Sequence, residues 1–284
     1  MQEHKVQCLS PAGFHDMHYT EWGARDNPRI VICVHGLSRN CRDFDTLAQT
    51  LEKDFRVVCP DIVGRGKSDW LSNKAGYVNA QYAADITTLM ARLSADSPCE
   101  ILWVGTSMGG IIGMMLAALP NTPIRCIVLN DVGGIVPKSA LARIVAYLGK
   151  DPRFGSFKEL ELCVRTISAP FGLLTDAQWE HLTRHNAKQH PNGQWGFNYD
   201  PGIALPFHSV EITDVALWQH YDPIACPTLL LRGADSDLLL KDTALAMTQR
   251  GPRARLVEFA GVGHAPMLMS TDQVGVVRDF LVSA

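Results

Sequence analysis

The sequence predicts an α/β protein with a mostly parallel, twisted sheet and helices on both of its faces. Strand-like and helix-like patterns alternate at least three times along the chain. The strand-like runs, such as Arg29–Val34 and Arg125–Leu129, are apolar throughout instead of at every second residue. That pattern is typical of parallel strands that are buried on both faces, so we expect helices above and below the sheet.

The composition indicates a globular protein of enzyme size. The chain has 284 residues, of which 46% are hydrophobic and 19% charged, and its formal net charge is −3. Such a chain has neither the signature of disorder nor the basic field that nucleic acid requires, so we expect no nucleic-acid partner. Residues 101–124 carry no charge, but glycines and prolines interrupt them, so we expect core and no membrane insertion. The first residues show no secretory signal, which predicts a cytoplasmic location.

The eight cysteines are scattered, and no pair has C-x-x-C spacing. A disulfide framework or a zinc site needs clustered cysteines, so we expect reduced, mostly buried thiols and no metal. The loop Gly64–Ser68 is glycine-rich and basic, but it lacks the full spacing of a phosphate-binding loop. The sequence therefore predicts no cofactor.

The predicted elements fall into two groups separated by an insertion. An antiparallel strand pair is expected around the turn at residues 10–13, and the core pattern continues to residue 135. The alternation of strand and helix patterns then stops. Residues 136–220 show three helical patterns and no convincing strand, and the last part of this range is aromatic and rich in glycine and proline. The alternation of strand and helix patterns resumes after residue 220. We therefore predict an α/β core formed by residues 1–135 and 221–284, with a helical lid, or cap, at residues 136–220.

One stretch in the core carries a reactive side chain. Residues 101–119 read as a buried strand, the turn Gly105-Thr106-Ser107-Met108-Gly109 and a buried helix. A G-x-S-x-G turn between a strand and a helix is a nucleophile elbow, which bends sharply enough to present its serine above the sheet. The five-residue pattern alone also fits a buried helix that contains glycines, so the choice between the two interpretations depends on motifs elsewhere in the chain.

Nucleophilic catalysis by Ser107 requires a base, an acid that orients the base, and donors for the oxyanion. An acid-bearing loop, residues 232–238, follows one predicted strand, and Gly263-His264 follows the next. The order Ser, Asp, His is the one expected for an elbow-type hydrolase. We therefore predict Ser107 as nucleophile and His264 as general base.

These motifs resemble the α/β-hydrolase superfamily, in particular its lidded, serine-dependent branch, over nearly the whole chain. The matching segments are Val34–Leu37, Asp61–Ser68, Gly105–Gly110, Leu231–Gly233 with the aspartates that follow, and Gly263–His264. The resemblance implies an α/β-hydrolase fold and an oxyanion hole built from the backbone N–H groups of Leu37 and Met108. We expect Asp61 and Arg65 to stabilise the loop beside the pocket, and His35 to be a structural, hydrogen-bonded histidine and not a second base.

The acid has three candidates, because Asp131, Asp235 and Asp237 all lie at predicted strand ends. The resemblance favours the loop after the strand at residues 229–232, with the acid three residues past the glycine, where this chain has Ser236. A one-residue insertion restores the alignment and selects Asp237. Asp235 is the next choice, and Asp131 stays open because some relatives take the acid from the preceding strand.

The resulting prediction is a serine hydrolase that cleaves a small to medium, largely apolar carboxylic ester, including esters of a short hydroxy acid. The alternatives are a carbon–carbon bond hydrolase acting on ring-cleavage products, a lactonase with the same triad, and a ligand-binding sensor on a hydrolase fold. His181 and His185 lie one helical turn apart, but no H-E-x-x-H pattern is present, and we expect them on a solvated lid surface. Nine aromatic residues of the lid are candidates to line the substrate pocket, and we expect roughly half of them to pack the lid on the core instead. The nine are Phe154, Phe157, Phe171, Trp179, Trp195, Phe197, Tyr199, Phe207 and Trp218. The oligomeric state is not readable from the sequence.

Overall fold

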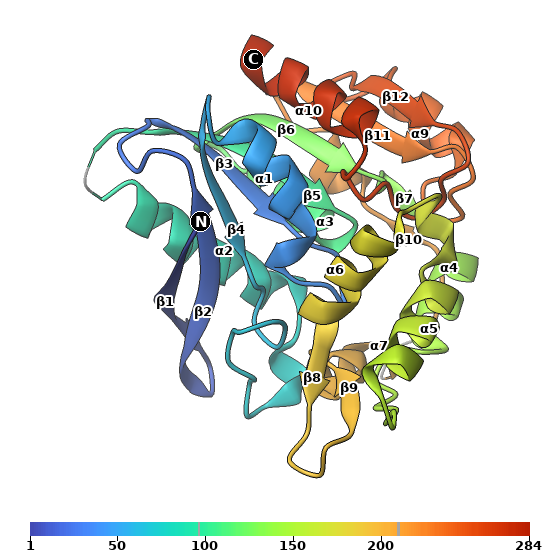
Figure 1. Cartoon of the computed structure of the whole chain (residues 1–284). Coiled ribbons are helices and arrows are strands. Elements are labelled where there is room, and N and C mark those ends of the chain that lie inside the picture. The colour runs from blue at the N-terminus through green and yellow to red at the C-terminus, as the bar shows by residue number, and fades with distance from the viewer. Residues whose placement is uncertain (96, 209–210) are drawn as a thin grey trace.

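The computed structural model describes residues 1–95, 97–208 and 211–284, and Figure 1 shows its elements in chain order. The strands of the main sheet are β1 (Gln2–Ser10), β2 (Gly13–Trp22), β3 (Arg29–Val34), β4 (Arg56–Pro60), β5 (Glu100–Thr106), β6 (Ile124–Asn130), β11 (Thr228–Gly233) and β12 (Arg255–Phe259). The helices that accompany these strands are α1 (Asp45–Leu51), α2 (Asn79–Leu93), α3 (Met108–Ala117), α8 (Trp218–Tyr221), α9 (Lys241–Met247) and α10 (Thr271–Ser283).

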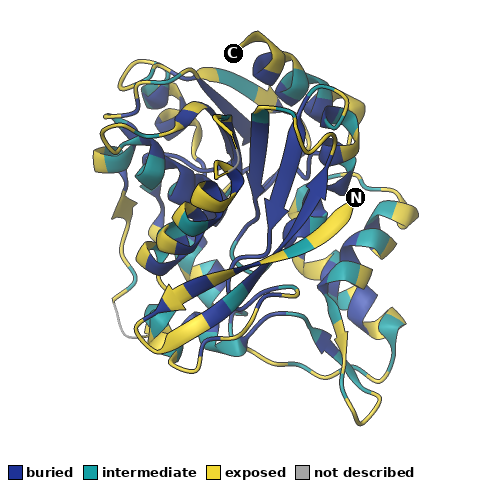
Figure 2. Ribbon diagram, turned by 90° about the vertical axis from the view of Figure 1, so that its left-hand side faces the viewer, coloured by how far each residue is buried: buried dark blue, intermediate teal, exposed yellow. Residues whose placement is uncertain are grey.

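The described strands form one sheet in the order β1-β2-β4-β3-β5-β6-β11-β12. Only the pairs β1–β2 and β2–β4 are antiparallel, and every other pair from β4 to β12 is parallel. Figure 2 shows the central strands buried along their length, whereas the outer strand β1 is exposed on alternate residues. The predicted mostly parallel sheet with an antiparallel edge is therefore confirmed.

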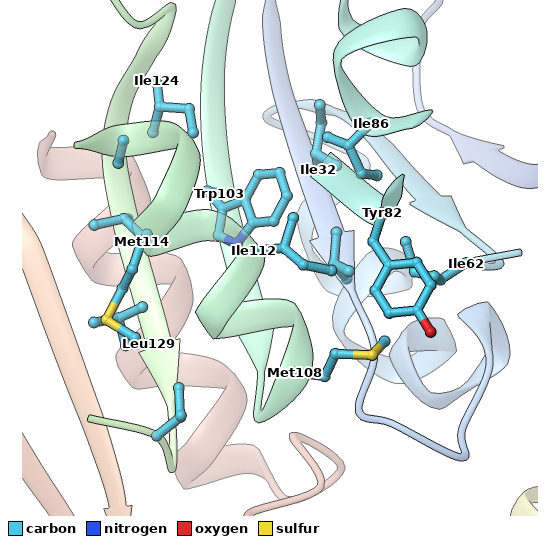
Figure 3. Packing of buried hydrophobic residues seen from close by; sticks show 14 of the residues in the cluster. Ile32, Ile62, Tyr82, Ile86, Trp103, Met108, Ile112, Met114, Ile124 and Leu129 are labelled. Atoms are coloured by element: carbon cyan, nitrogen blue, oxygen red, sulfur yellow. The ribbon is translucent and has the colours of Figure 1, made fainter. Parts of the chain in front are cut away.

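Helices cover both faces of the sheet. On one face, Ile86 of α2 and Ile112 of α3 belong to the same buried cluster as Trp103 of β5, which Figure 3 shows beside α3. On the other face, Leu47 of α1 and Leu281 of α10 pack in a second cluster with the alternate residues of the strands. Because successive side chains of a strand point to opposite faces, a strand that is apolar throughout supplies both cores at once.

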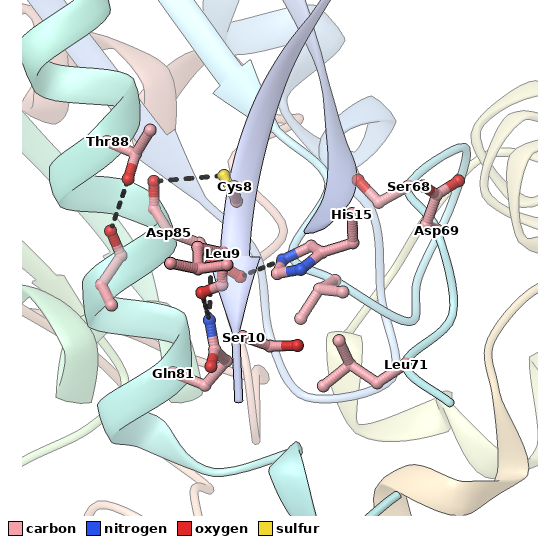
Figure 4. A network of polar contacts seen from close by, with 12 residues as sticks. Cys8, Leu9, Ser10, His15, Ser68, Asp69, Leu71, Gln81, Asp85 and Thr88 are labelled. Atoms are coloured by element: carbon pink, nitrogen blue, oxygen red, sulfur yellow. Dashed lines mark hydrogen bonds and ion pairs between the residues drawn. The ribbon is translucent and has the colours of Figure 1, made fainter. Parts of the chain in front are cut away.

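The antiparallel edge is attached to the core through a buried carboxylate. Asp85 of α2 accepts hydrogen bonds from Gln81 at 2.7 Å and pairs with Nε2 of His15 on β2 at 3.0 Å (Figure 4). Gln81 also donates to the carbonyl oxygen of Leu9 on β1 at 2.9 Å. This network holds the β1–β2 hairpin against α2. The buried polar residues His15, Gln81 and Asp85 therefore have a structural role at the edge of the sheet.

Residues between β6 and β11 form a separate layer at one end of the sheet (Figure 1). Its helices are α4 (Lys138–Val145), α5 (Phe157–Ile167), α6 (Asp176–Asn186) and α7 (Leu205–His208). A small apolar cluster joins α5 and α6 to Met267 and Met269 of the core. The range predicted as a helical lid, residues 136–220, lies within this stretch, and its residues 209–210 lie outside the described part of the chain.

The expectation of no strand in this layer is wrong. Its described residues include four short strands: β7 (Ile135–Val136) pairs with β10 (Val215–Ala216), and β8 (Ala187–Gln189) pairs with β9 (Trp195–Phe197). They are two or three residues long, which is too short for an alternating pattern to stand out in the sequence. The three predicted helices are all found.

All eight cysteines are free, and five of them are buried. Among the described residues, no helix has both the length and the apolar character that a membrane crossing requires.

Glycines let α3 approach the sheet closely. A Cβ at Gly109 would lie 2.0 Å from the carbonyl oxygen of Val34, and one at Gly113 would lie 2.2 Å from Nε1 of Trp103. Trp103 is fully buried and donates a hydrogen bond to the carbonyl oxygen of Gly109 at 3.1 Å. The helix that begins at the elbow is therefore seated by contacts that only glycine permits.

Two helical glycines test this packing. We expect Gly113→Ala to destabilise the protein by about 1–3 kcal/mol, because the added methyl group collides with the Trp103 ring. Gly275→Ala, in α10 where nothing lies within 4 Å of the added Cβ, should instead stabilise it by about 0.5–1 kcal/mol through helix propensity. Urea unfolding of both variants measures the difference, and equal effects would contradict the close packing of α3.

Candidate active site

Ser107 occupies the turn between β5 and α3. Its backbone has φ 52° and ψ −115°, a conformation that costs a non-glycine residue about 1–3 kcal/mol and that the surrounding packing must enforce. The close contacts of Gly105 and Gly109 supply that constraint, since a Cβ on Gly105 would lie 2.4 Å from the Gly109 carbonyl oxygen. The predicted elbow is therefore present, and its serine side chain is partly exposed.

The Ser107 hydroxyl contacts a histidine from the far end of the chain. Nε2 of His264 lies 3.0 Å from Oγ of Ser107, and Nδ1 of the same ring lies 2.7 Å from Oδ2 of Asp131. A carboxylate oxygen only accepts, so Nδ1 carries the proton and Nε2 is left to accept from the hydroxyl. The three side chains form one continuous hydrogen-bonded chain.

Asp131 follows β6 and is fully buried, with 0% of its surface exposed. Its Oδ1 accepts from the backbone N–H of Gly233 at 2.9 Å, and its Oδ2 accepts from the hydroxyl of Ser236 at 2.6 Å. These donors come from the last residue of β11 and from the loop that follows it. They offset the cost of burying a carboxylate and leave Oδ2 directed at the His264 ring.

The choice of Asp237 as the acid is corrected by this geometry. Asp237 is 47% exposed and pairs with Arg143 through two hydrogen bonds of 2.6 and 2.9 Å. Asp235 is exposed as well. The loop after β11 does face His264, but the residue that occupies the usual acid position is Ser236, whose hydroxyl supports Asp131 instead. No one-residue insertion is needed, and the carboxylate comes from the neighbouring strand.

The turn after β3 that carries Leu37 is held by two buried side chains. His35 contacts the Gly36 carbonyl oxygen through Nδ1 at 2.7 Å and accepts from the N–H of Ile62 through Nε2 at 2.9 Å. Arg65, which is also fully buried, donates to the carbonyl oxygens of Leu37 and Val63, each at 2.8 Å. Both residues fix backbone, in agreement with their expected structural role.

Asp61 closes the same loop from the other side. Its carboxylate accepts from the backbone N–H groups of Cys41 and Lys67 and pairs with Nδ1 of His18. Burial raises the pKa of Asp61, but the hydrogen bond from His18 and the other donors outweigh it, and the net pKa is lowered. The carboxylate therefore stays charged and anchors the loop.

Three groups of side chains bring potential metal ligands within 4.8 Å of one another in the described chain: Cys8, His15 and Asp85; His18, Cys41 and Asp61; Asp45, His181 and His185. Burial raises the pKa of Cys8 to about 12 and that of Cys41 well above its usual value, which opposes a thiolate ligand. Asp45 is already paired with Arg42. In the other two groups, the carboxylates of Asp85 and Asp61 are paired with His15 and His18.

His181 and His185 are not on the solvated surface that the sequence suggested. Both are half-buried, and Nε2 of His181 lies 2.9 Å from the Arg42 carbonyl oxygen. Burial, together with the Arg42 charge, lowers the pKa of His185 to about 4. The pair joins α6 to the short helix at Cys41–Phe44, so it positions the inserted layer over the core.

Two cavities open beside Ser107. One, of about 270 Å³, is lined by His264, Leu37 and residues of α4 and α5, and the other, of about 290 Å³, by Met108, Leu37 and aliphatic residues. Of the nine aromatic residues considered from the sequence, four line these cavities: Phe171, Phe197, Tyr199 and Phe207. The others include Trp179 and Trp195, which pack within the inserted layer.

Comparison with known proteins identifies the family. The profile described as "Alpha/beta hydrolase family" matches residues 31–277. The chain belongs to this family. A 3-hydroxybutyrate-oligomer hydrolase of Cupriavidus necator is 47% identical, and the match covers 98% of this chain and 97% of the relative. Lipase LipV of Mycobacterium tuberculosis is 25% identical, with 94% of this chain and 98% of the relative covered.

Solved structures agree with this assignment. A putative hydrolase from Rickettsia typhi superposes with a TM-score of 0.93 at 29% identity, covering 100% of both chains. An alpha/beta hydrolase from Novosphingobium aromaticivorans gives a TM-score of 0.87 at 32% identity, covering 99% of both. The resemblance drawn from the elbow and its companion motifs is thus confirmed at the level of superfamily and fold, and the relatives are hydrolases and esterases.

Sequence reasoning about this α/β hydrolase missed the cations around the first cavity. Arg39, Arg143 and Lys150 all line it, although they lie far apart along the chain. Arg143 lies on α4, which ends at Val145, whereas Lys150 follows in the turn beyond it, so no helical spacing signals that the two share a cavity. Arg39 comes from the turn after β3, and only the tertiary structure brings it to the same cavity.

The buried His35 predicts a pH dependence of stability. Burial lowers the pKa of His35 to about 4, below the ordinary value of 6.5, so the unfolded chain binds the extra proton more readily. Its contribution to stability is complete above pH 6.5 and is lost as the pH falls toward 4, by about 3 kcal/mol.

Gln is the matched replacement for His35, because its Oε1 can accept the hydrogen bond that the backbone N–H of Ile62 donates to Nε2 of His35. Between pH 7 and pH 4.5 we expect His35→Gln to lose less unfolding free energy than the wild type, as measured by urea titration. Parallel pH profiles of the two proteins would contradict the neutral, buried state of His35.

Proposed function

We propose that this α/β hydrolase cleaves carboxylic esters through an acyl-enzyme on Ser107. The observation that carries the proposal is the hydrogen-bonded chain from Ser107 through His264 to Asp131, with separations of 3.0 and 2.7 Å. Ser107 is the nucleophile, His264 the general base and acid, and Asp131 the residue that orients the His264 ring. Asp131 replaces Asp237 in the catalytic set.

In the first half-reaction, Oγ of Ser107 attacks the carbonyl carbon of the ester while Nε2 of His264 takes the hydroxyl proton. The tetrahedral intermediate collapses when the bond to the alcohol oxygen breaks and His264 returns the proton to that oxygen. The alcohol leaves, and the acyl group stays on Ser107. Asp131 stabilises the imidazolium that exists between the two proton transfers.

The oxyanion of the intermediate is stabilised by the backbone N–H groups of Leu37 and Met108. Met108 is the first residue of α3, where a helical N–H has no partner within the helix. The Leu37 N–H donates to no protein acceptor in the described part of the chain. Each such donor is worth about 2.7–4 kcal/mol in the transition state. Arg65 and His35 support this role by fixing the backbone on either side of Leu37.

In the second half-reaction, water replaces the alcohol. His264 takes a proton from the water as the oxygen attacks the acyl carbon, and then returns it to Oγ of Ser107 when the acyl bond breaks. The carboxylic acid product leaves and the site is restored. Residues 136–220 act as a lid in this scheme, because their side chains supply much of the wall of both cavities.

The substrate class follows from similarity to the Cupriavidus necator 3-hydroxybutyrate-oligomer hydrolase, at 47% identity over nearly the full length of both chains. We propose that short oligomers of a hydroxy acid such as 3-hydroxybutyrate are the substrates. Both cavities are close to the lower end of the usual range for ligand sites, about 300 Å³, which favours small units on either side of the scissile bond.

The choice of acid gives a direct test. Asp131→Asn should lower kcat for p-nitrophenyl butyrate by about 10³- to 10⁴-fold, because the amide favours the wrong tautomer of His264. Asp237→Asn should keep kcat for this neutral ester within about threefold, since Asp237 pairs only with Arg143. Steady-state kinetics of the two variants decide between the acids.

Ser107→Ala is the companion variant. It should abolish labelling by a fluorophosphonate probe and lower kcat by about 10⁶-fold, as removal of a serine nucleophile does in other hydrolases. Full activity of Ser107→Ala, or a probe adduct on another residue, would exclude the proposed acyl-enzyme.

A further inference from the structure

The two cavities beside Ser107 differ in charge. The first, here called the cationic cavity, is lined by Arg39, Arg143 and Lys150 against a single carboxylate, Asp43, among its described residues. The second, here called the aliphatic cavity, has Glu211 as its charged residue. Its apolar lining includes Val132, Val136, Leu141, Val145, Leu217 and Leu238. Leu37, Ser107 and Ile144 border both cavities, so a substrate bound at the serine extends into each.

The cations of the first cavity are not equally available. Arg39 is engaged with Asp43 through two hydrogen bonds of 2.6 and 2.8 Å. Arg143 binds Asp237 through Nε and one terminal nitrogen and also interacts with the Tyr147 side chain of the same cavity; its two terminal nitrogens carry four N–H donors, of which Asp237 takes one. Lys150 is exposed, and its ammonium group has no hydrogen bond or ion pair within the described chain. Arg143 and Lys150 are therefore the groups that can accept a new anionic partner.

The position of His264 gives the substrate a direction. The alcohol oxygen receives its proton from Nε2 of His264, so the alcohol half of the ester must lie on the side of this ring. His264, together with Ala265 and Met267, lines the cationic cavity, and none of the three borders the aliphatic one. The alcohol half thus belongs in the cationic cavity and the acyl half in the aliphatic cavity.

Hydroxy-acid oligomers have the charge distribution that this arrangement requires. At the last ester bond of such an oligomer, the alcohol half carries the free carboxylate, while the acyl half is neutral. Hydrogen bonds between a cation and a carboxylate are about twice as strong as those between neutral groups. An uncharged, mostly aliphatic acyl unit instead matches the second cavity.

We propose that Arg143 and Lys150 bind the terminal carboxylate of the substrate, so that the enzyme removes hydroxy-acid units from the carboxyl end. The inference rests on the proposed ester hydrolysis and adds the specificity residues and the direction of cleavage. The first half-reaction leaves the remainder of the oligomer on Ser107 in the aliphatic cavity and releases one hydroxy acid from the cationic cavity. Hydrolysis of the acyl-enzyme then frees the shortened oligomer.

Two substrates that differ only at the terminal carboxylate measure how much this group contributes to recognition. The 3-hydroxybutyrate dimer and the same dimer with its carboxylate converted to a primary amide differ in charge and little in shape. The wild type should prefer the acid dimer by about 10- to 100-fold in kcat/KM, the range expected for charge-assisted hydrogen bonds of about 1.5–3 kcal/mol. In the double variant Arg143→Gln, Lys150→Gln the ratio should fall to about one.

A charge-matched control separates local recognition from the overall field of the protein. Lys241→Gln combined with Arg255→Gln removes the same two charges from exposed positions outside both cavities and should leave the ratio unchanged. If both double variants lose the preference equally, or if the wild type cleaves the two dimers at the same rate, carboxylate recognition by Arg143 and Lys150 is wrong. Ester hydrolysis by Ser107 would stand in that case.

The direction is tested with a tetramer labelled with ¹³C in its carboxyl-terminal unit. Mass spectrometry should find the label in the first monomer released. A first monomer without label would overturn the assignment of the two cavities. Failure of the wild type to cleave any of these oligomers, while it still cleaves p-nitrophenyl butyrate, would overturn this inference and the hydroxy-acid substrate but not the esterase mechanism.

Discussion

A buried carboxylate at the end of β6 connects the parts of the site. Asp131 accepts hydrogen bonds from Gly233 at the end of β11 and from Ser236 in the loop that follows, and it faces His264 from the loop after β12. Without these donors a fully buried aspartate would be strongly unfavourable. Because they are all present, one oxygen is left positioned for the histidine ring, and three segments that are distant in sequence meet at one point.

The serine reaches this point because the sheet and α3 are packed closely. Glycines at positions 105, 109 and 113 remove the side chains that would separate α3 from its neighbours, and the fully buried Trp103 fills the space beside the helix. The strained backbone of Ser107 is enforced by this packing. On the other side of the serine, His35 and Arg65 hold the turn that carries Leu37. The reacting groups are thus preorganised by core contacts that have no chemical role themselves.

The inserted layer adds selectivity to this common machinery. It contributes Arg143 and Lys150 to one cavity and aliphatic side chains such as Leu141 and Val145 to the other. The sheet, the elbow and His264 belong to the core, whereas the charge difference between the cavities depends on this layer. On the proposed function, an ester with one neutral and one anionic half matches the two cavities, with its anionic half in the cationic cavity.

The sequence by itself determined the parallel sheet, the antiparallel edge, the elbow at Ser107 and the partnership with His264. These features depend on local patterns: apolar runs, turn residues and the order of motifs along the chain. It did not determine the acid, because Asp131, Asp235 and Asp237 all follow strands and only their positions in space distinguish them. Asp131 lies buried beside the ring, whereas Asp237 points to Arg143 at the surface. The sequence also did not show which cations line the cavity beside Ser107. Arg39 and Arg143 line the same cavity only because the inserted layer folds over the carboxyl ends of the strands.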